Sequence, residues 1–267
     1  YVHPEKDEIF WINPENQAAH AIADKIKLRA FLSAHGAKLE AIKTDSIDAS
    51  HQQTTVDLVN KVSQLQGPLR ALNWYAHQAE RLVSPPLQDR HLRGNPEFDY
   101  LLSKFENNRF LSIENGRIVF AGEDERFYVN GGWLEEHVYA VINTLRKQVP
   151  MIQDVGRSVE ITRGTGNPVV RNEIDVAFLA NNKLYIIECK TKHFGRSNGQ
   201  SGSGADAIYK LDTLKDLLGG LHGQAMLVSY GELNRFDRQR AADLQVEICN
   251  GTDIQSLSSR IRQWIGG

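Results

Sequence analysis

Residues 171–190 read RNEIDVAFLANNKLYIIECK, and this stretch decides the fold. Its two halves, residues 171–180 and 183–190, have the apolar pattern that is typical of β-strands. The linking pair Asn181-Asn182 predicts a two-residue hairpin turn, because asparagine tolerates positive φ. We therefore expect an antiparallel β-hairpin in this part of the chain.

Counting outward from this turn pairs Asp175 with Glu188 across the two strands. The same register pairs Glu173 with Lys190. Since successive side chains point to opposite faces of a strand, all four charged side chains should share one face. The other face should then be an apolar surface that packs on the core. It consists of Ile174, Val176, Phe178, Tyr185, Ile187 and Cys189.

The facing carboxylates of Asp175 and Glu188 repel each other, which should destabilise the hairpin unless a divalent cation lies between them. Carboxylate oxygens are preferred ligands of Mg²⁺ or Mn²⁺, and the backbone carbonyl of Cys189 is a further candidate ligand. Lys190 is placed to hold or deprotonate a metal-bound water, or to stabilise charge on a phosphate. The pattern predicts metal-dependent hydrolysis of phosphodiester bonds, with Asp175, Glu188 and Lys190 as catalytic residues.

An isolated Glu-x-Lys sequence also arises by chance, because about a quarter of residues in proteins are charged. The alternative to a metal site is an exposed ladder of ion pairs, in which Glu173 pairs with Lys190 and Asp175 with Arg171. The hairpin register, an acid-bearing helix before it and a basic helix after it favour the metal site.

A helix is expected over residues 133–147, with an apolar stripe along one side. Glu135 borders this stripe and can face the hairpin carboxylates, whereas Glu136 points nearly opposite and should lie in water. Glu135 is therefore a candidate metal ligand, and a solvated charge at the helix margin is the alternative. The stripe consists of Leu134, Val138, Val141, Ile142 and Leu145.

The chain that follows Lys190 is basic and then rich in glycine and serine. A stretch that contains His193 leads into residues 195–204, which either close over a nucleic-acid backbone or form a surface connection. His193 is a lesser candidate for an acid or base, since Lys190 already fills that role. Lys210, on the flank of the next helix, can face phosphate, but lysines in such positions are usually solvated.

The order of the other elements around the hairpin predicts an α/β fold, with a mixed sheet flanked by helices. Further strands are expected at 158–162, 225–230 and 245–249, and further helices at 206–218, 234–244 and 254–265.

The upstream half of the chain has a different pattern. Pro68 is expected at a helix start. The elements that follow together resemble a winged helix, which either binds DNA or serves packing and dimerisation. They are helices at 52–65, 68–82 and 97–107 and a hairpin at 110–113 and 117–120. Before them, residues 15–35 have helical periodicity, and residues 39–42 suggest a short strand.

The composition sets outer limits. A chain of 267 residues with 41% hydrophobic content can bury a core and should form two domains. Its net charge of −2 gives no global attraction for nucleic acid, so binding would need a local basic surface. Cys189 and Cys249 are expected to be buried thiols rather than a disulfide or a zinc site. With no apolar run long enough to span a bilayer and no secretory leader, the chain is expected to be cytoplasmic, without a membrane partner.

Three motifs carry a resemblance: GGWLE at residues 131–135, RNEIDV at 171–176 and IECKT at 187–191. Together with YKL at 209–211 and LLGG at 217–220, they resemble the nuclease domain of CRISPR ancillary effectors, which join an N-terminal CARF domain to a PD-(D/E)XK domain.

This resemblance implies a restriction-endonuclease-like fold, a homodimer, and Mn²⁺- or Mg²⁺-dependent cleavage of nucleic acid that a cyclic oligoadenylate activates through the CARF dimer. It also implies metal acids at Asp175 and Glu188, a catalytic lysine at Lys190 and a helix acid at Glu135.

On this basis we expect a C-terminal remnant of a CARF-like domain at 1–35, a winged-helix-like linker domain at 36–126 and a PD-(D/E)XK nuclease domain at 127–267. Because most of a CARF domain is missing, this chain alone should not bind the activator. The expected substrate is single-stranded DNA or RNA. The alternatives are a winged-helix module that binds nucleic acid or a partner beside a structural nuclease-like half, and a structure-specific nickase or resolvase.

Overall fold

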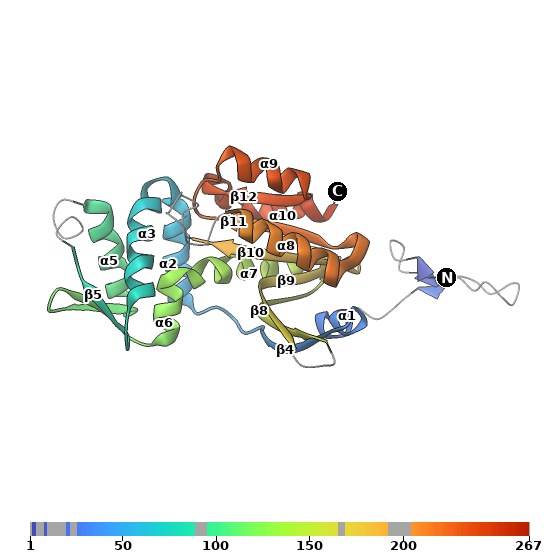
Figure 1. Ribbon diagram of the computed structural model, residues 1–267, viewed down its shortest axis with the longest axis horizontal. Helices are drawn as coiled ribbons and strands as arrows, with labels where there is room; N and C mark the ends of the chain where they lie inside the picture. The colour runs from blue at the N-terminus through green and yellow to red at the C-terminus, as the bar shows by residue number, and fades with distance from the viewer. Residues whose placement is uncertain are drawn as a thin grey trace, which may run out of the picture.

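The protein is described by a computed structural model, which places residues 2–3, 8–9, 20–21, 26–88, 95–164, 169–191 and 204–266. A six-stranded sheet forms the middle of the molecule (Figure 1). Its strands are β4 (Ala37–Lys43), β8 (Ile152–Arg163), β9 (Val170–Ala180), β10 (Lys183–Lys190), β11 (Gln224–Ser229) and β12 (Val246–Asn250). Their order across the sheet is β12-β11-β10-β9-β8-β4.

The predicted hairpin is confirmed as β9 and β10. The two strands pair antiparallel from Lys183 with Ala180 to Ile187 with Val176. The turn residues have φ values of 49° and 57°, the left-handed backbone that asparagine accepts. Strand β11 pairs parallel with β10, and β12 parallel with β11, so the sheet is mixed as expected.

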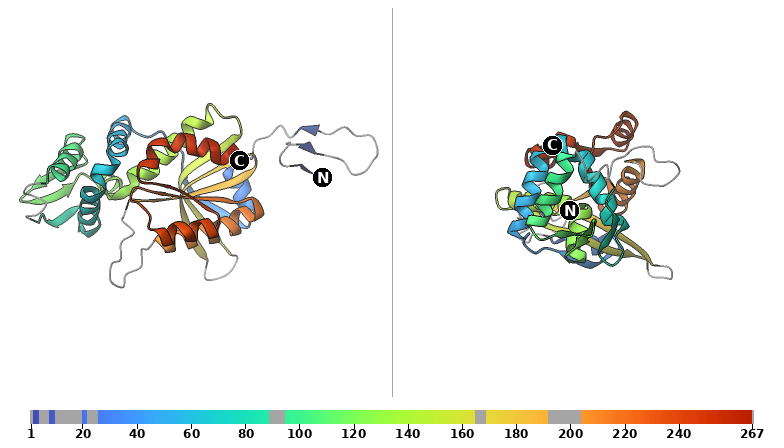
Figure 2. Two further views of the ribbon diagram at one scale, coloured as in Figure 1. Left: turned by 90° about the horizontal axis from the view of Figure 1, so that it is seen from above. Right: turned by 90° about the vertical axis from the view of Figure 1, so that its left-hand side faces the viewer.

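Helices cover both faces of the sheet (Figure 2). On one face lie α7 (Trp133–Arg146) and α10 (Leu257–Gly266). On the other face lie α1 (Leu28–Ala34), α8 (Gly204–Gly219) and α9 (Arg235–Asp243). The hairpin therefore has two buried faces, and the expectation of a single core face was wrong. Both faces are buried because helices pack on both sides of this sheet, which contains parallel strands.

The alternation of side chains along β9 changes at Asp175. Val176 and Phe178 pack with α7 and α10, but Ile174 packs in the opposite core with Leu179. On the neighbouring strand β8, Ser158 has a φ of 47°, in the left-handed region. The pleat is thus irregular beside the predicted site, although β8 and β9 stay in register there, and such a local irregularity can re-aim a side chain.

A helical region lies at one end of the sheet (Figure 1). It contains α2 (Ala49–Asn60), α3 (Val62–Gln78) and α5 (Pro96–Asn107), with a three-stranded sheet of β5 (Val83–Pro86), β7 (Arg117–Phe120) and β6 (Leu111–Glu114). Pro68 lies inside α3 and does not start a helix. One continuous core joins this region to the face of the sheet under α7.

Residues 15–35 are not one helix in the described part of the chain. His20–Ala21 is strand β3, which pairs with β2 (Glu8–Ile9), and β2 pairs with β1 (Val2–His3). Helix α1 begins only at Leu28, whose backbone N–H donates to Asp154 Oδ2 at 3.0 Å. The contact with the sheet therefore decides where the helix begins, because helices gain most of their stability from packing.

Strand β4 is the edge strand of the large sheet, paired antiparallel with β8. Residues 28–43 thus pack with the C-terminal half of the chain, although the sequence analysis divided the chain at 36 and 127. The three-part division and the winged-helix interpretation remain predictions. Among the described residues, no helix is long and apolar enough to cross a membrane.

Candidate active site

The candidate site lies at the end of β10, where the large sheet meets the helical region. Asp175 and Glu188 are 9% and 4% exposed, so they are buried and do not form an exposed ladder of ion pairs. Asp175 Oδ2 accepts a hydrogen bond from the backbone N–H of Cys189 at 2.7 Å. The pairing of β9 with β10 ends at Val176, so the Asp175 carboxylate takes a backbone donor of β10 just beyond the regular ladder.

Glu188 is held by two lysines. Its Oε1 accepts from Lys190 Nζ at 2.5 Å, and its Oε2 accepts from Lys210 Nζ at 2.7 Å. Lys190 lies two residues along the same strand, and Lys210 comes from α8. From the sequence, Lys210 could face phosphate or be solvated, and its contact with Glu188 was not predicted.

Burial and nearby like charges shift the pKa values of the carboxyl groups in this site. The pKa of Asp175 is raised to about 7, first because burial disfavours the charged form and then because Glu188 is nearby. Lys190, the Cys189 N–H and Lys210 act in the opposite direction. Burial would lower the pKa of Lys190, but the charges of Glu188 and Asp175 raise it above its ordinary value. In the ion-free site, Lys190 is therefore protonated at neutral pH.

Glu135 belongs to the same cluster of charges. Its pKa is raised to about 9, first by burial and then by the charges of Asp175 and Glu173, with Lys190 opposing. Leu134 and Val138 beside it are fully buried, as the apolar stripe predicted. Glu135 therefore lies close enough to the hairpin carboxylates for their charges to raise its pKa. A solvated side chain at the helix margin would have kept a pKa near the usual range.

Cys189 and Cys249 are free, buried thiols, as predicted. Burial raises the pKa of the Cys189 thiol well above its ordinary value, and the nearby charge of Asp175 adds to the effect. The Cys189 side chain packs in the core under α7, so only its backbone carbonyl remains a candidate ligand.

Thr191, the residue after Lys190, ties the site to the helical region. The Asn73 amide on α3 lies 2.9 Å from Thr191 Oγ1. In the orientation that satisfies both ends of the amide, Oδ1 accepts from Thr191 while Nδ2 donates to the carbonyls of Val129 and Leu69. Gly131, with a φ of 125°, packs so closely that an added Cβ would lie 2.3 Å from Thr191 Oγ1. Sequence reasoning missed this contact.

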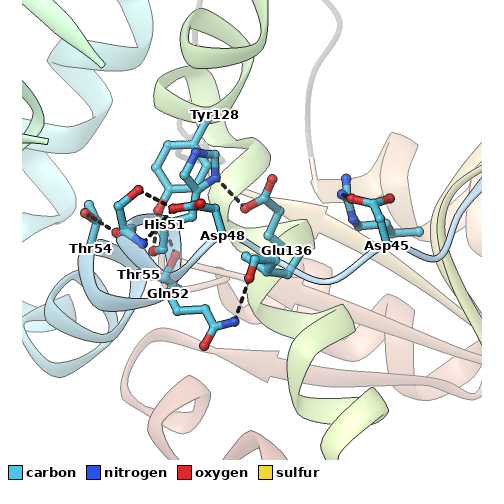
Figure 3. A network of polar contacts seen from close by, with 11 residues as sticks. Asp45, Asp48, His51, Gln52, Thr54, Thr55, Tyr128 and Glu136 are labelled. Carbon is cyan, nitrogen blue, oxygen red and sulfur yellow. Dashed lines mark hydrogen bonds and ion pairs between the residues drawn. The ribbon is translucent and has the colours of Figure 1, made fainter. Parts of the chain in front are cut away.

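Glu136 was expected to lie in water, and this was wrong. His51 Nδ1 on α2 lies 2.9 Å from Glu136 Oε2, and both side chains are largely covered (Figure 3). Tyr128 donates to the His51 carbonyl at 2.9 Å and accepts from Thr55 at 2.8 Å. The helical region packs over this side of α7, so a partner distant in sequence replaces water.

No group of three or more His, Cys, Asp or Glu side chains is arranged to hold a metal ion among the placed residues. The donor chemistry nevertheless fits a hard divalent cation, because buried carboxylates converge and raise one another's pKa. Both oxygens of Glu188 are engaged by lysines instead. His193 and residues 195–203 lie outside the described residues.

The mixed sheet with helices on both faces defines the fold class of a restriction-endonuclease-like domain. Residues 121–266 match the family described as Card1-like, endonuclease domain. The chain belongs to this family, because the match covers more than half of it. No curated protein matches the chain.

Two solved structures are similar over nearly the whole chain. Protein VC1899 from Vibrio cholerae is 32% identical, with a TM-score of 0.82 over 99% of this chain and 68% of that one. Can2 from Sulfobacillus thermosulfidooxidans, in complex with cyclic tetra-adenylate, is 26% identical, with a TM-score of 0.75 over 100% of this chain and 68% of that one. The resemblance to CRISPR ancillary nucleases and the fold class are thereby confirmed.

Proposed function

We propose that this endonuclease uses Mg²⁺ or Mn²⁺ to hydrolyse phosphodiester bonds in single-stranded DNA or RNA. Two observations support the proposal: the carboxylates of Asp175 and Glu188 are both buried, and the ammonium of Lys190 donates to Glu188. Buried like charges of this kind are destabilising unless a cation offsets them.

Asp175 and Glu188 would hold the ion, with Glu135 and the carbonyl of Cys189 as further ligands. When bound, the cation supplies a water of lowered pKa and polarises the phosphoryl oxygen. Lys190 would hold a metal-bound water or stabilise the negative charge that develops on the phosphate. The Cys189 N–H fixes the orientation of the Asp175 carboxylate.

Regulation and assembly extend this proposal. The solved Can2 structure contains cyclic tetra-adenylate. We propose that a cyclic oligoadenylate activates this nuclease through a CARF domain, and that the active form is a cytoplasmic homodimer.

The test is a digestion of single-stranded DNA, single-stranded RNA, duplex and branched DNA with Mn²⁺, Mg²⁺ or EDTA. We expect cleavage of a single-stranded substrate with either ion, no cleavage in EDTA, and loss of cleavage in Lys190→Ala. Lys38→Met, at an exposed pair with Glu40, is the control and should cut like the wild type.

Binding without cleavage under every ion would support a nucleic-acid-binding module instead. Cleavage confined to duplex or branched DNA would support a nickase or resolvase. Either result would contradict the proposed function.

A further inference from the structure

The position of Lys210 beside Glu188 suggests a role for this residue in the proposed site. Its ammonium is the donor to Glu188 Oε2, at 2.7 Å, while Lys190 occupies Oε1. A cation bound by Glu188 needs at least one of these oxygens. Each oxygen has a second lone pair, but a lysine ammonium and a bound cation at the same carboxylate repel each other, which favours the departure of one of the two lysines.

Lys210 is the lysine that can leave most readily. Lys190 lies on β10, where the strand pairs with β11 and its carbonyl accepts from the Tyr230 N–H at 2.8 Å. The charge of Lys190 also lowers the pKa values of Asp175 and Glu135. If Lys190 left Glu188, it would still lie beside these two carboxylates. Lys210 reaches in from α8, and its side chain is 38% exposed, close to the 35% of Lys190, so the two lysines differ in the elements that carry them and not in exposure.

We propose that Lys210 occupies the cation's place on Glu188 in the ion-free enzyme and binds a phosphate of the nucleic acid once the ion is held. The inference rests on the proposed function and adds a phosphate-binding residue to it. The ammonium is a point charge on a long stem, which suits an exchange between two anionic partners. A released ammonium at the rim of the site would face the incoming phosphate backbone, where cations contribute most to affinity.

This exchange predicts two effects of opposite sign. Lys210→Met keeps the stem and removes the competitor for Glu188. The protein without nucleic acid should then bind Mn²⁺ about tenfold more tightly, since a hydrogen bond to a charged group contributes about that much. The same variant should bind a single-stranded oligonucleotide about tenfold more weakly in Ca²⁺ and cut it more slowly in Mn²⁺.

The experiment measures Mn²⁺ affinity by electron paramagnetic resonance or calorimetry, and oligonucleotide affinity by fluorescence anisotropy. Three variants are compared with the wild type: Lys210→Met, Lys210→Arg and the exposed control Lys38→Met. Lys210→Arg keeps the charge and should leave Mn²⁺ affinity near that of the wild type, and Lys38→Met should change neither affinity. Thermal unfolding confirms that each variant is folded, and Lys210→Arg carries the test if Lys210→Met is not.

Three outcomes overturn the inference. If Lys210→Met binds Mn²⁺ as the wild type does, or more weakly, Lys210 is not a competitor. If Mn²⁺ affinity rises while oligonucleotide affinity stays unchanged, Lys210 does not bind phosphate. In both cases wild-type cleavage in Mn²⁺ leaves the proposed function intact. If the wild type neither binds Mn²⁺ nor cuts, the proposed function fails and the inference fails with it.

Discussion

Two buried carboxylates near the end of β10 are expected to lower the stability of the fold. Asp175 and Glu188 are carboxylates removed from water, and the lysines that offset them come from the same strand and from α8. Buried charges are retained only when partners neutralise them, and removing one member of such a set has large effects. Substitutions that remove charge without changing shape therefore separate stability from activity.

Asp175→Asn should stabilise the ion-free protein by about 1–3 kcal/mol, because it removes a buried charge whose pKa is already raised to about 7. The Asn Oδ1 can still accept from the Cys189 N–H. Cleavage should fall by at least about 100-fold, since an amide is a poor ligand for a hard cation. Thermal unfolding in EDTA and a cleavage assay measure the two effects.

Asp216→Asn is the matched control, because its side chain is 68% exposed, and neither quantity should change appreciably. An Asp175→Asn protein that is less stable than the wild type in EDTA would contradict the interpretation of an electrostatically destabilised site.

At the scale of elements, the turn before α7 is shaped by its contact with the end of β10. Gly131→Ala should destabilise the fold by about 1–3 kcal/mol, because the φ of 125° is unfavourable for alanine and the new Cβ would meet Thr191. Cleavage should also fall, since Glu135 follows on the same turn of chain. Denaturant unfolding and steady-state cleavage test this.

Gly67→Ala is the control for this effect of backbone geometry. Gly67 lies inside α3, and nothing lies within 4 Å of an added Cβ. This change should stabilise the protein by about 0.5–1 kcal/mol, because alanine favours a helix interior. If Gly131→Ala and Gly67→Ala changed the free energy of unfolding equally, the contact with Thr191 would be unimportant.

The pair between α2 and α7 should make stability depend on pH. Burial lowers the pKa of His51, but Glu136, Asp48 and Glu125 outweigh it and raise the pKa above 6.5. A raised pKa gives stability that is fully present below about pH 6.5 and is lost as pH rises through the folded-state pKa.

His51→Ala should therefore destabilise the fold more at about pH 5.5 than at about pH 8.5, by about 0.5–1 kcal/mol after allowance for solvent screening. Urea unfolding at the two pH values measures the difference. His77→Ala, on the exposed side of α3, is the control and should show no such dependence. If His51→Ala destabilised the fold more at the higher pH than at the lower, the ion pair with Glu136 would be excluded.

At the scale of the whole molecule, the large sheet is assembled from both ends of the described chain. Leu39 on β4 is 5% exposed and packs in the same core as Ile161 on β8 and Ile174 on β9. Leu39→Ala should cost about 2–4 kcal/mol and should increase hydrogen exchange in β8. The distant hairpin of β6 and β7 should keep its protection.

Val56→Ala, at a position that is 47% exposed, is the matched control and should change exchange nowhere by a comparable amount. If Leu39→Ala instead loosened β6 and β7 and left β8 unchanged, β4 would belong energetically to the helical region.

Other predictions failed or were incomplete for an identifiable physical reason. The helix expected at 15–35 followed from periodicity alone, but α1 begins where Leu28 and Leu32 reach the sheet and Asp154 accepts the first N–H. Pro68 was expected to start a helix, yet packing on both sides of it keeps α3 continuous. Periodicity describes which side of a helix is apolar and does not say where tertiary contacts begin.

The sequence by itself determined the hairpin and its turn, because φ preferences at Asn181-Asn182 and the two-residue period of a strand are properties of neighbouring residues. Only the tertiary structure decided the partners of Glu188, Thr191 and Glu136. These are Lys210, Asn73 and His51, which lie 22, 118 and 85 residues away along the chain. Contacts at such separations depend on how whole elements pack, and no local pattern records that.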